Sequence, residues 1–283
     1  MKVSYYPGCS LHSTALEYDE STQEVCQILD IDLNELNDWN CCGASSAHST
    51  DEILAIELPL RNLVTAEEAG MDLVVPCAAC FQRLKVAEKH IIEEKEPAIE
   101  TSYQGKVPVK HLLDFFSEEE NLKVIKEKVK KPLSGLKAVC YYGCLIVRPP
   151  EITDAIDHEN PQAMDELLTL LGAETYPWSY KTDCCGGGLL LSRTDIIIQL
   201  SGKLLQMAEE SGANCIVTAC PVCQVNLDTR QAEISKNLGK EVHFPVFYFT
   251  ELLGLALGSE EVGQWLERHI ADPSDLLKSK NLL

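Results

Sequence analysis

The sequence predicts an α/β protein built from two similar tandem domains, and three observations carry this prediction. Segments about half the chain apart resemble one another, each half repeats one spacing of cysteines, and strand-like runs alternate with helical patterns in both halves. A chain of 283 residues holds two domains of ordinary size. We place an N-terminal domain with a linker helix at 1–133 and a C-terminal domain at 134–283.

The duplication is visible in four pairs of segments. One member of each pair lies in the first half and the other in the second, in the same order. The pairs are KVSYYPGC (2–9) with KAVCYYGC (137–144), CCGASS (41–46) with CCGGGL (184–189), DLVVPCAAC (72–80) with CIVTACPVC (215–223), and, more loosely, VKHLLDFF (109–116) with VFYFTELL (246–253).

Ten of the 13 cysteines follow a repeated spacing, which is C-x31-CC-x34-C-x2-C in the first half and C-x39-CC-x34-C-x2-C in the second. The 34-residue gap is identical in the two halves. The longer first gap of the second half contains PPEITDAIDHENP, which is typical of a loop insertion. The ten residues are Cys9, Cys41, Cys42, Cys77 and Cys80, and then Cys144, Cys184, Cys185, Cys220 and Cys223.

The strands come from short aromatic and β-branched runs. VSYY and LKAVCYY are expected to be strands that lead to Cys9 and Cys144. The continuous apolar runs LVVP and CIVTA are typical of buried strands, and each leads into a CxxC pair. All ten cysteines therefore fall at strand ends or helix starts, where backbone N–H groups can point at an anionic centre.

Helical patterns lie between these strands. Asp51 and Thr194 are expected N-caps, and Pro161 suits a first helical position. A connecting segment at 95–135 contains KVIKEKVKK (123–131), whose lysines predict a solvated helix face or, alternatively, a docking surface. The other expected helices are Ser13–Leu29, Asp51–Ala69, Pro161–Leu171 and Thr194–Glu210.

Composition and charge exclude several classes of protein. The net charge of −20 disfavours binding to nucleic acid or to anionic membranes, which needs clustered Lys and Arg. The chain shows no secretory leader and no apolar run long enough to span a membrane. We therefore expect a cytoplasmic protein whose thiols stay reduced, in which many cysteines indicate a metal or redox centre.

Five thiols in each half limit what the sites can hold. A CxxC pair suits a metal or a cluster, whereas two adjacent cysteines serve one tetrahedral ion poorly but can serve two irons of one cluster. Gly43 and Gly186 follow the adjacent pairs and let the backbone turn closely. Structural zinc would leave one cysteine unused in each half, and a dithiol relay would leave three. An iron–sulfur centre uses all ten. Cys26, Cys140 and Cys215 are expected to be buried core residues.

The ten-cysteine pattern resembles that of the CCG-domain (cysteine-rich) family, and within it the B subunits of heterodisulfide reductases, over nearly the whole chain. The resemblance implies two [4Fe-4S] clusters of the noncubane type, one on each set of five cysteines. It also implies reduction of a disulfide, coenzyme M–coenzyme B heterodisulfide or a related one, with the clusters facing each other across a pseudo-two-fold axis. The implied partners are the iron–sulfur C subunit and the flavin-containing A subunit of such a reductase, with a hydrogenase or formate dehydrogenase as a further partner.

Two alternative functions remain at this stage. One is an iron–sulfur electron-transfer subunit of a glycolate or lactate oxidase, although the ferredoxin-type cysteine runs of those proteins are missing here. The other is an anchoring subunit of the succinate–quinone reductase type, with zinc in one site. The substrate is a small-molecule or protein disulfide in the main hypothesis.

A few polar residues near the cysteines are secondary candidates. His12 and His48 could donate a proton to a leaving thiolate, or they could be ordinary surface or structural histidines. Four cations could attract an anionic disulfide or could simply form surface ion pairs. They are Arg83, Arg148, Lys181 and Arg193.

Overall fold

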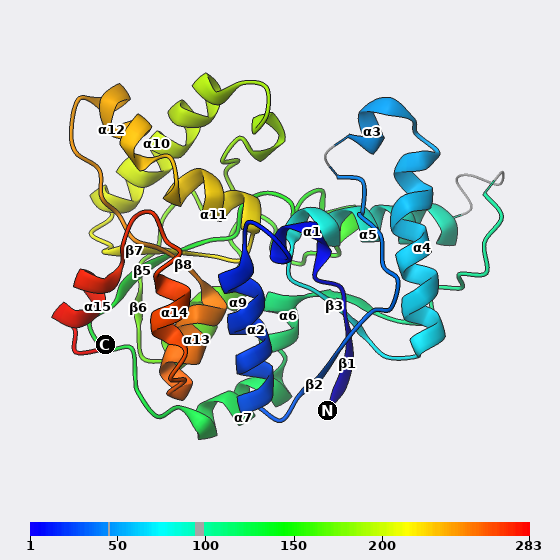
Figure 1. The fold of residues 1–283 in the computed structure, drawn as a ribbon, viewed down its shortest axis with the longest axis horizontal. Coiled ribbons are helices and arrows are strands. Elements are labelled where there is room, and N and C mark those ends of the chain that lie inside the picture. Colours follow the sequence, from blue (N-terminus) through cyan, green and yellow to red (C-terminus); the bar gives the residue numbers. More distant parts are fainter. Residues whose placement is uncertain (45, 94–98) are drawn as a thin grey trace.

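A computed structural model describes residues 1–44, 46–93 and 99–283, and it contains two four-stranded parallel sheets (Figure 1). The strand orders are β2-β1-β3-β4 and β6-β5-β7-β8. The strand order is the same in both halves: the second strand of the half lies at one edge, followed by the first, third and fourth. The predicted α/β fold with tandem duplicated domains is confirmed.

The first half supplies the first sheet and the helices that cover it. Its strands are β1 (Lys2–Tyr5), β2 (Asp32–Glu35), β3 (Leu73–Val75) and β4 (Val109–His111). Its helices are α1 (Gly8–Leu11), α2 (Leu16–Ile28), α3 (Ala47–Thr50), α4 (Leu54–Ala69), α5 (Ala78–Ile92), α6 (Leu112–Phe116) and α7 (Glu119–Lys128).

The second half repeats this plan and adds a C-terminal helical segment. Its strands are β5 (Lys137–Tyr141), β6 (Glu174–Thr175), β7 (Cys215–Thr218) and β8 (Val246–Tyr248). Its helices are α8 (Pro150–Thr153), α9 (Ala163–Leu170), η1 (Gly187–Leu189), α10 (Thr194–Glu210), α11 (Pro221–Asp228), α12 (Gln231–Leu238), α13 (Phe249–Leu257), α14 (Val262–Leu266) and α15 (Ser274–Ser279).

The four predicted strands are confirmed, but three helix starts were predicted wrongly. Helix α2 begins at Leu16 because the residues after Cys9 form a separate short helix and a turn. The Asp51 carboxylate does accept a hydrogen bond from the Leu54 amide at 2.9 Å, but the helix starts only at Leu54. Pro161 lies outside α9, and its carbonyl oxygen instead accepts a hydrogen bond from Lys181.

The fourth predicted helix has the correct bounds, but its cap is displaced by one residue. Thr194 is the first residue of α10, and Arg193 occupies the N-cap position without a side-chain hydrogen bond to the helix. The Asp195 carboxylate binds the Arg193 guanidinium, so it does not cap the helix either. This end of α10 therefore lacks a side-chain cap.

The segment expected to be a connection contributes to the first sheet. Strand β4 and helix α6 belong to the N-terminal half, because β4 pairs with β3 in parallel. Helix α7 then leads to the second half and ends at Lys128. Its Lys123 side chain is 67% exposed whereas Ile125 is fully buried, so the helix has the predicted exposed face, which suits either a solvated face or a docking surface. Residues 95–98 of the predicted connection lie outside the described residues.

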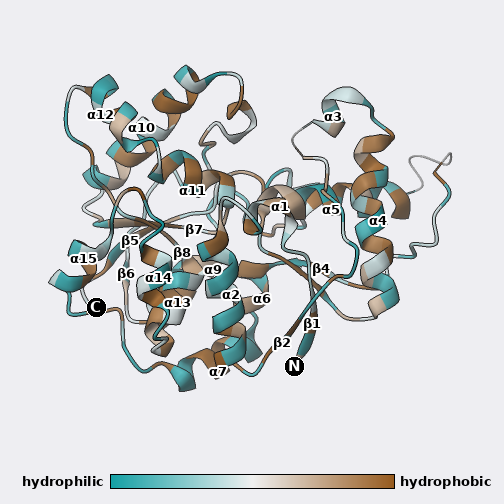
Figure 2. Cartoon of the chain, in the orientation of Figure 1, coloured by the Kyte–Doolittle hydropathy of each residue, from teal (hydrophilic) through white to brown (hydrophobic). Residues whose placement is uncertain are grey.

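The two halves pack against each other through helices that occupy equivalent positions in the duplicated fold. Helix α2 of the first half packs on α13 and α14, while α9 of the second half packs on α6 (Figure 1). Tyr18 and Tyr248 stack in parallel with their ring centroids 4.2 Å apart. Ser21 and Thr250 hydroxyls hydrogen-bond at 2.7 Å nearby. Helices α2 and α7 mix hydrophobic and hydrophilic residues, as expected for helices with one packed face and one exposed face (Figure 2).

Candidate metal centres

The fold brings the ten cysteines of the repeated pattern to equivalent positions in the two halves. In each sheet the strands are parallel, so the segments that follow them leave the same edge. The first cysteine follows β1 or β5, the adjacent pair follows β2 or β6, and the CxxC pair follows β3 or β7. Three sequence segments of each half are therefore gathered at one edge of its sheet.

Sulfur atoms of the first half come close together across these segments. The Cys42 and Cys80 sulfurs are 3.4 Å apart. The amide N–H of Gly43 points at the Cys41 sulfur, with the nitrogen 3.4 Å away. Cys77 is the N-cap residue of α5, and the Cys80 thiol hydrogen-bonds to it. Cys9 and Cys41 are exposed while the other three are buried.

The second half repeats this geometry. The Cys185 and Cys223 sulfurs are 3.6 Å apart, and the Gly186 nitrogen lies 3.3 Å from the Cys184 sulfur. Cys220 is the N-cap residue of α11. Cys184 is exposed and Cys144 partly so, while the remaining three cysteines are buried. Each set thus has three enclosed sulfurs and two on the solvent side.

Glycines provide the space that these sulfurs need. A Cβ atom on Gly8 would lie 2.7 Å from the Cys80 sulfur, and one on Gly143 would lie 2.9 Å from the Cys223 sulfur. Gly43 and Gly186 have φ values of +76° and +88°, a region that side chains disfavour. The close turn after each adjacent pair, predicted from the sequence, is therefore confirmed.

Several of these thiols are poised to be thiolates. The hydrogen bond from Cys41, together with that from Cys80, lowers the pKa of Cys42 to about 3. The hydrogen bond from Cys144 lowers the pKa of Cys184 to about 6. Hydrogen bonding with a neighbouring thiol also lowers the pKa of Cys77 and of Cys185, and it raises the pKa of the partner thiols Cys80 and Cys223. Thiolate is the form in which cysteine binds metals.

The donor set fits an iron–sulfur cluster. Among the described residues no three His, Cys, Asp or Glu side chains are arranged around a single metal ion. The sulfurs do converge pairwise from separate segments, and the pKa of Cys42 and of Cys184 is lowered, which favours the deprotonated form that a ligand needs. All of the converging side chains are cysteines, the residue whose thiolate iron–sulfur clusters use as a ligand.

The three remaining cysteines are buried, as predicted. Cys26, Cys140 and Cys215 are at most 1% exposed. Burial raises the pKa of Cys26 and of Cys215 to about 12. These thiols therefore stay protonated and serve as small core residues.

Among the described residues, no hydrogen bond joins either candidate histidine to a cysteine. His12 lies 3.5 Å from the Glu35 carboxylate, and its ring packs against Trp39 at 5.3 Å. His48 is exposed in α3. The structure therefore gives neither of them a proton-donor position, and that role stays a prediction.

Three of the four candidate cations form ion pairs. Arg148 pairs with Glu159 and Arg193 with Asp195, while the buried Lys181 pairs with Asp165 at 2.9 Å. Arg83 forms no ion pair with any residue that the structure describes, and its charge helps lower the pKa of Cys42. Arg83 is thus the candidate cation with the most direct influence on a centre.

Sequence reasoning missed the side chains that join the two centres. Burial raises the pKa of Tyr18 well above its ordinary value, and Cys220 and Cys77 raise it further, so Tyr18 lies near one CxxC pair of each half. Its hydroxyl donates to the Ala219 carbonyl at 3.3 Å. His111 is fully buried, with its Nε2 atom 3.0 Å from the Pro76 carbonyl. Tyr18 sits in an ordinary helical pattern, so no sequence signal distinguished it.

His111 also touches both halves. Burial lowers its pKa to about 4, so the imidazole is neutral at neutral pH, and the carbonyls of Pro76 and Ala219 both face it. Its Nδ1 atom accepts a hydrogen bond from Leu113, so Nε2 carries the proton. Pro76 and Ala219 directly precede Cys77 and Cys220. The two CxxC turns are therefore held together by shared buried side chains.

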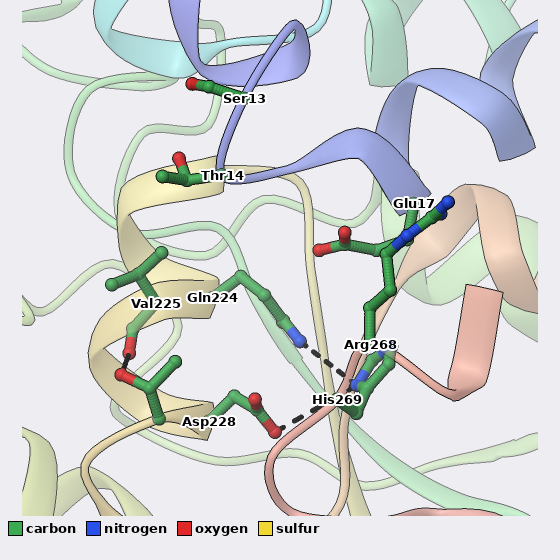
Figure 3. A pocket seen from close by; sticks show the side chains of 9 residues that line it. Ser13, Thr14, Glu17, Gln224, Val225, Asp228, Arg268 and His269 are labelled. Carbon is green, nitrogen blue, oxygen red and sulfur yellow. Dashed lines mark hydrogen bonds and ion pairs between the residues drawn. The ribbon is translucent and has the colours of Figure 1, made fainter.

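A pocket of about 140 Å³ lies where the halves meet (Figure 3). Ser13, which lines it, donates a hydrogen bond to the Cys9 carbonyl, and Gln224 directly follows Cys223. Its floor contains the buried His269, whose Nε2 atom is 2.8 Å from Glu251. The lining residues are Ser13, Thr14, Glu17, Gln224, Val225, Asp228, Thr229, Arg268 and His269.

The fold and the two cysteine sets together define the class of protein. It is a duplicated α/β protein in which each half carries five cysteines at the same edge of its sheet. Residues 3–85 and 138–228 match the CCG family, described as a cysteine-rich domain. The matches span more than half of the chain, so the chain belongs to this family and contains two copies of its domain.

The relatives match nearly the whole length of the chain. It is 31% identical to the 8-methylmenaquinol:fumarate reductase membrane anchor subunit of Wolinella succinogenes, over 97% of this chain and 99% of that one. It is 29% identical to the B subunit of the ferredoxin:CoB-CoM heterodisulfide reductase of Methanosarcina mazei, over 91% and 89%. A protein of Archaeoglobus profundus, described as similar to the heterodisulfide reductase B subunit, is 27% identical over 91% of each chain. The resemblance to the B subunits is thus confirmed.

One solved structure has the same fold. A hypothetical protein from Helicobacter pylori superposes with a TM-score of 0.73 at 11% identity, over 96% of this chain and 52% of that one. At this identity the similarity concerns the fold alone. Within the described residues of the present chain, no helix is both long and apolar enough to cross a membrane.

Proposed function

We propose that the chain is the catalytic iron–sulfur subunit of a heterodisulfide reductase-type complex, which reduces a disulfide to two thiols. Its two [4Fe-4S] clusters would be of the noncubane type that the family resemblance implies. The first would be held by Cys9, Cys41, Cys42, Cys77 and Cys80, and the second by Cys144, Cys184, Cys185, Cys220 and Cys223.

One observation carries the proposal: two equivalent five-thiol sets whose CxxC turns meet around shared buried side chains. Reducing a disulfide takes two electrons and two protons, and an iron–sulfur cluster supplies electrons when bound. Two centres held at one junction are suited to act on the same bond. The solvent-side cysteines, among them Cys9 and Cys184, leave each centre an open side for a substrate.

The chain's own residues prepare this chemistry. Three cysteines of each set are buried, which excludes water from the inner side of each centre. The pocket between the halves, which Gln224 lines directly after Cys223 in the sequence, contains Glu17, a carboxyl whose pKa burial raises to about 7. Such a group holds a proton near neutral pH and can release it. The pocket therefore offers a proton source at the junction of the halves.

Electron donors must come from other subunits. The relatives are named as subunits of reductase complexes. We propose an iron–sulfur C subunit and a flavin-containing A subunit as the electron donors, with a hydrogenase or formate dehydrogenase further upstream. We also propose that the complex is located in the cytoplasm.

Metal analysis and turnover test this function. The complete chain, purified without oxygen and reconstituted with iron and sulfide, is expected to bind about eight irons, four for each cluster. With a chemical reductant it should reduce coenzyme M–coenzyme B heterodisulfide or another small disulfide. Chains that lack iron after reconstitution would contradict the proposal, and zinc in one site would argue against direct reduction.

A second function is favoured by one observation. The relative of 31% identity, matched over 99% of its length, is a subunit of a menaquinol:fumarate reductase. In that case the chain would carry electrons between a quinol and a flavin subunit, or anchor that subunit, and it would not act on a disulfide. Reoxidation of the reduced centres distinguishes the two: rapid reoxidation by a quinone analogue, with none by disulfides, would favour this alternative.

A further inference from the structure

A buried tyrosine hydroxyl lies beneath the adjacent cysteine pair of each half. The Tyr6 hydroxyl donates to the Asn40 carbonyl at 2.7 Å, and the Tyr141 hydroxyl donates to the Asp183 carbonyl at 2.7 Å. Asn40 directly precedes Cys41, and Asp183 directly precedes Cys184. The same hydrogen bond is thus made twice, to the same point of each cysteine loop.

The surroundings of the two tyrosines are also duplicated. Both are completely buried, next to or at the end of the first strand of their half. The Tyr6 ring meets Trp39 edge-on at 5.5 Å, and the Tyr141 ring meets Trp178 at 6.1 Å. Burial raises the pKa of both tyrosines, and the cysteines of their own half raise it further. Both hydroxyls therefore remain protonated and able to donate.

The cysteine loops depend on side-chain hydrogen bonds for their conformation. Each adjacent pair lies outside any helix or strand and is followed by a glycine at positive φ. A hydrogen bond to the carbonyl just before the pair helps to fix the peptide that carries the first cysteine; in the first half the Asn62 amide also donates to this carbonyl at 3.0 Å. Such a bond contributes about 1 kcal/mol to stability, which is small for the fold but large for the orientation of a short loop.

We propose that Tyr6 and Tyr141 are equivalent positioning residues, each of which orients the adjacent cysteine pair of its own half so that both sulfurs face one cluster. Nothing in the family match assigns this role. The inference rests on the proposed iron–sulfur function, and it concerns how the chain holds a cluster rather than the reaction.

The test uses Tyr6→Phe, Tyr141→Phe and the double variant in the complete chain, reconstituted without oxygen. Iron release to a chelator and the electron paramagnetic resonance spectrum are measured. Each single variant should release the iron of one cluster several-fold faster and alter one of the two sets of signals, and the two variants should affect different sets. The double variant should affect both.

Tyr5→Phe is the matched control. It neighbours Tyr6, is also buried, and its hydroxyl bonds to the Asp19 carboxylate at 2.8 Å instead of to a cysteine loop. It should leave iron release and both sets of signals unchanged. Circular dichroism of the metal-free chains separates loss of a cluster from loss of fold. If one variant fails to fold, the other decides, because the same result is expected of both.

The outcomes separate this inference from the function on which it rests. A wild-type chain without iron would contradict the proposed function. A wild-type chain with two clusters, combined with tyrosine variants that match it in iron release and in spectrum, would overturn the positioning role. Equal effects of Tyr5→Phe and Tyr6→Phe would also overturn it, because loss of any buried hydroxyl would then suffice.

Discussion

At the scale of single residues, the two centres share a plan but differ in their outer contacts. The position three residues after the second CxxC cysteine is Arg83 in the first half and Asn226 in the second. The Arg83 charge acts on Cys42, whereas the Asn226 amide donates to the Cys185 sulfur at 3.4 Å. Hydrogen bonds and charge near cluster sulfurs tune reduction potentials, so the centres need not be equivalent.

Replacing Asn226 by leucine should lower the reduction potential of the second centre. A donor to a ligating sulfur favours the more negative, reduced form, and leucine of similar volume removes that donor. A spectroscopic redox titration of the reconstituted chain would show one centre shifted and the other constant. A shift of both centres, or of neither, would contradict the assignment of Asn226 to the second centre.

Replacing Gly8 or Gly143 by alanine should abolish cluster binding in the same half. The new Cβ would lie 2.7 Å or 2.9 Å from a ligand sulfur, closer than atoms pack, and the left-handed backbone adds about 1–2 kcal/mol of strain. Gly70→Ala is the control, because Gly70 has a similar φ of +66° but open space around it. Half the iron should be lost in the first two variants and none in the control.

At the scale of elements, helices that pack across the junction between the halves hold the two centres next to each other. Helix α2 packs on α13, and Tyr18 stacks on Tyr248 while bonding to the carbonyl before Cys220. Helix α2 belongs to the half of the first centre, but its Tyr18 contacts the CxxC turn of the second. The distance between the centres thus depends on helix packing across the halves.

Tyr18→Ala should destabilise the junction by about 3–5 kcal/mol, the usual cost of removing a large buried aromatic side chain. Tyr18→Phe keeps the stacked ring and loses one weak hydrogen bond, so it should cost about 1 kcal/mol. Urea unfolding of the metal-free chains measures both free energies. Similar costs for the two variants would show that stacking on Tyr248 contributes little.

At the scale of the whole molecule, buried charges join the C-terminal segment to the second centre's helix. Helix α11 carries Cys223 and, five residues later, Asp228, whose carboxylate accepts hydrogen bonds from the backbone amides of Ile270 and Ala271. His269 lies between Glu251 and Asp228, with its side chain only 1% exposed. Residues 269–271 therefore help to fix the helix that carries Cys223.

These charges predict a loss of stability at alkaline pH. Burial lowers the pKa of His269, but Glu251 and Asp228 outweigh it and raise the pKa from 6.5 to about 9. A raised pKa stabilises the fold fully below 6.5, and this contribution disappears as the pH rises through 9. Glu17 titrates nearby, with a pKa that burial raises to about 7, and Arg268 adjoins it.

The measurement compares wild type with His269→Gln. The unfolding free energy of the wild type should fall between pH 7 and 9, and the variant should show a smaller fall, because the glutamine does not titrate. The thiols titrate in both proteins, so the difference between them isolates His269. Parallel curves would show that His269 is not charged in the folded protein.

The sequence alone determined the duplication and four of the strands, β1, β3, β5 and β7. It also determined that ten cysteines follow equivalent strands in the two halves and that the other three cysteines are buried. These features are local or periodic, so repeated letters and apolar runs suffice to identify them. Helix starts such as Leu16 and Ala163 depended on turns that the sequence does not specify. Only the tertiary structure decided that β4 completes the first sheet and that Arg83 stays without an ion pair among the described residues. It also decided which buried side chains surround the centres, namely Tyr6, Tyr141, Tyr18 and His111. Contacts between residues far apart in the chain follow from how helices pack across a junction, and no local pattern records that packing.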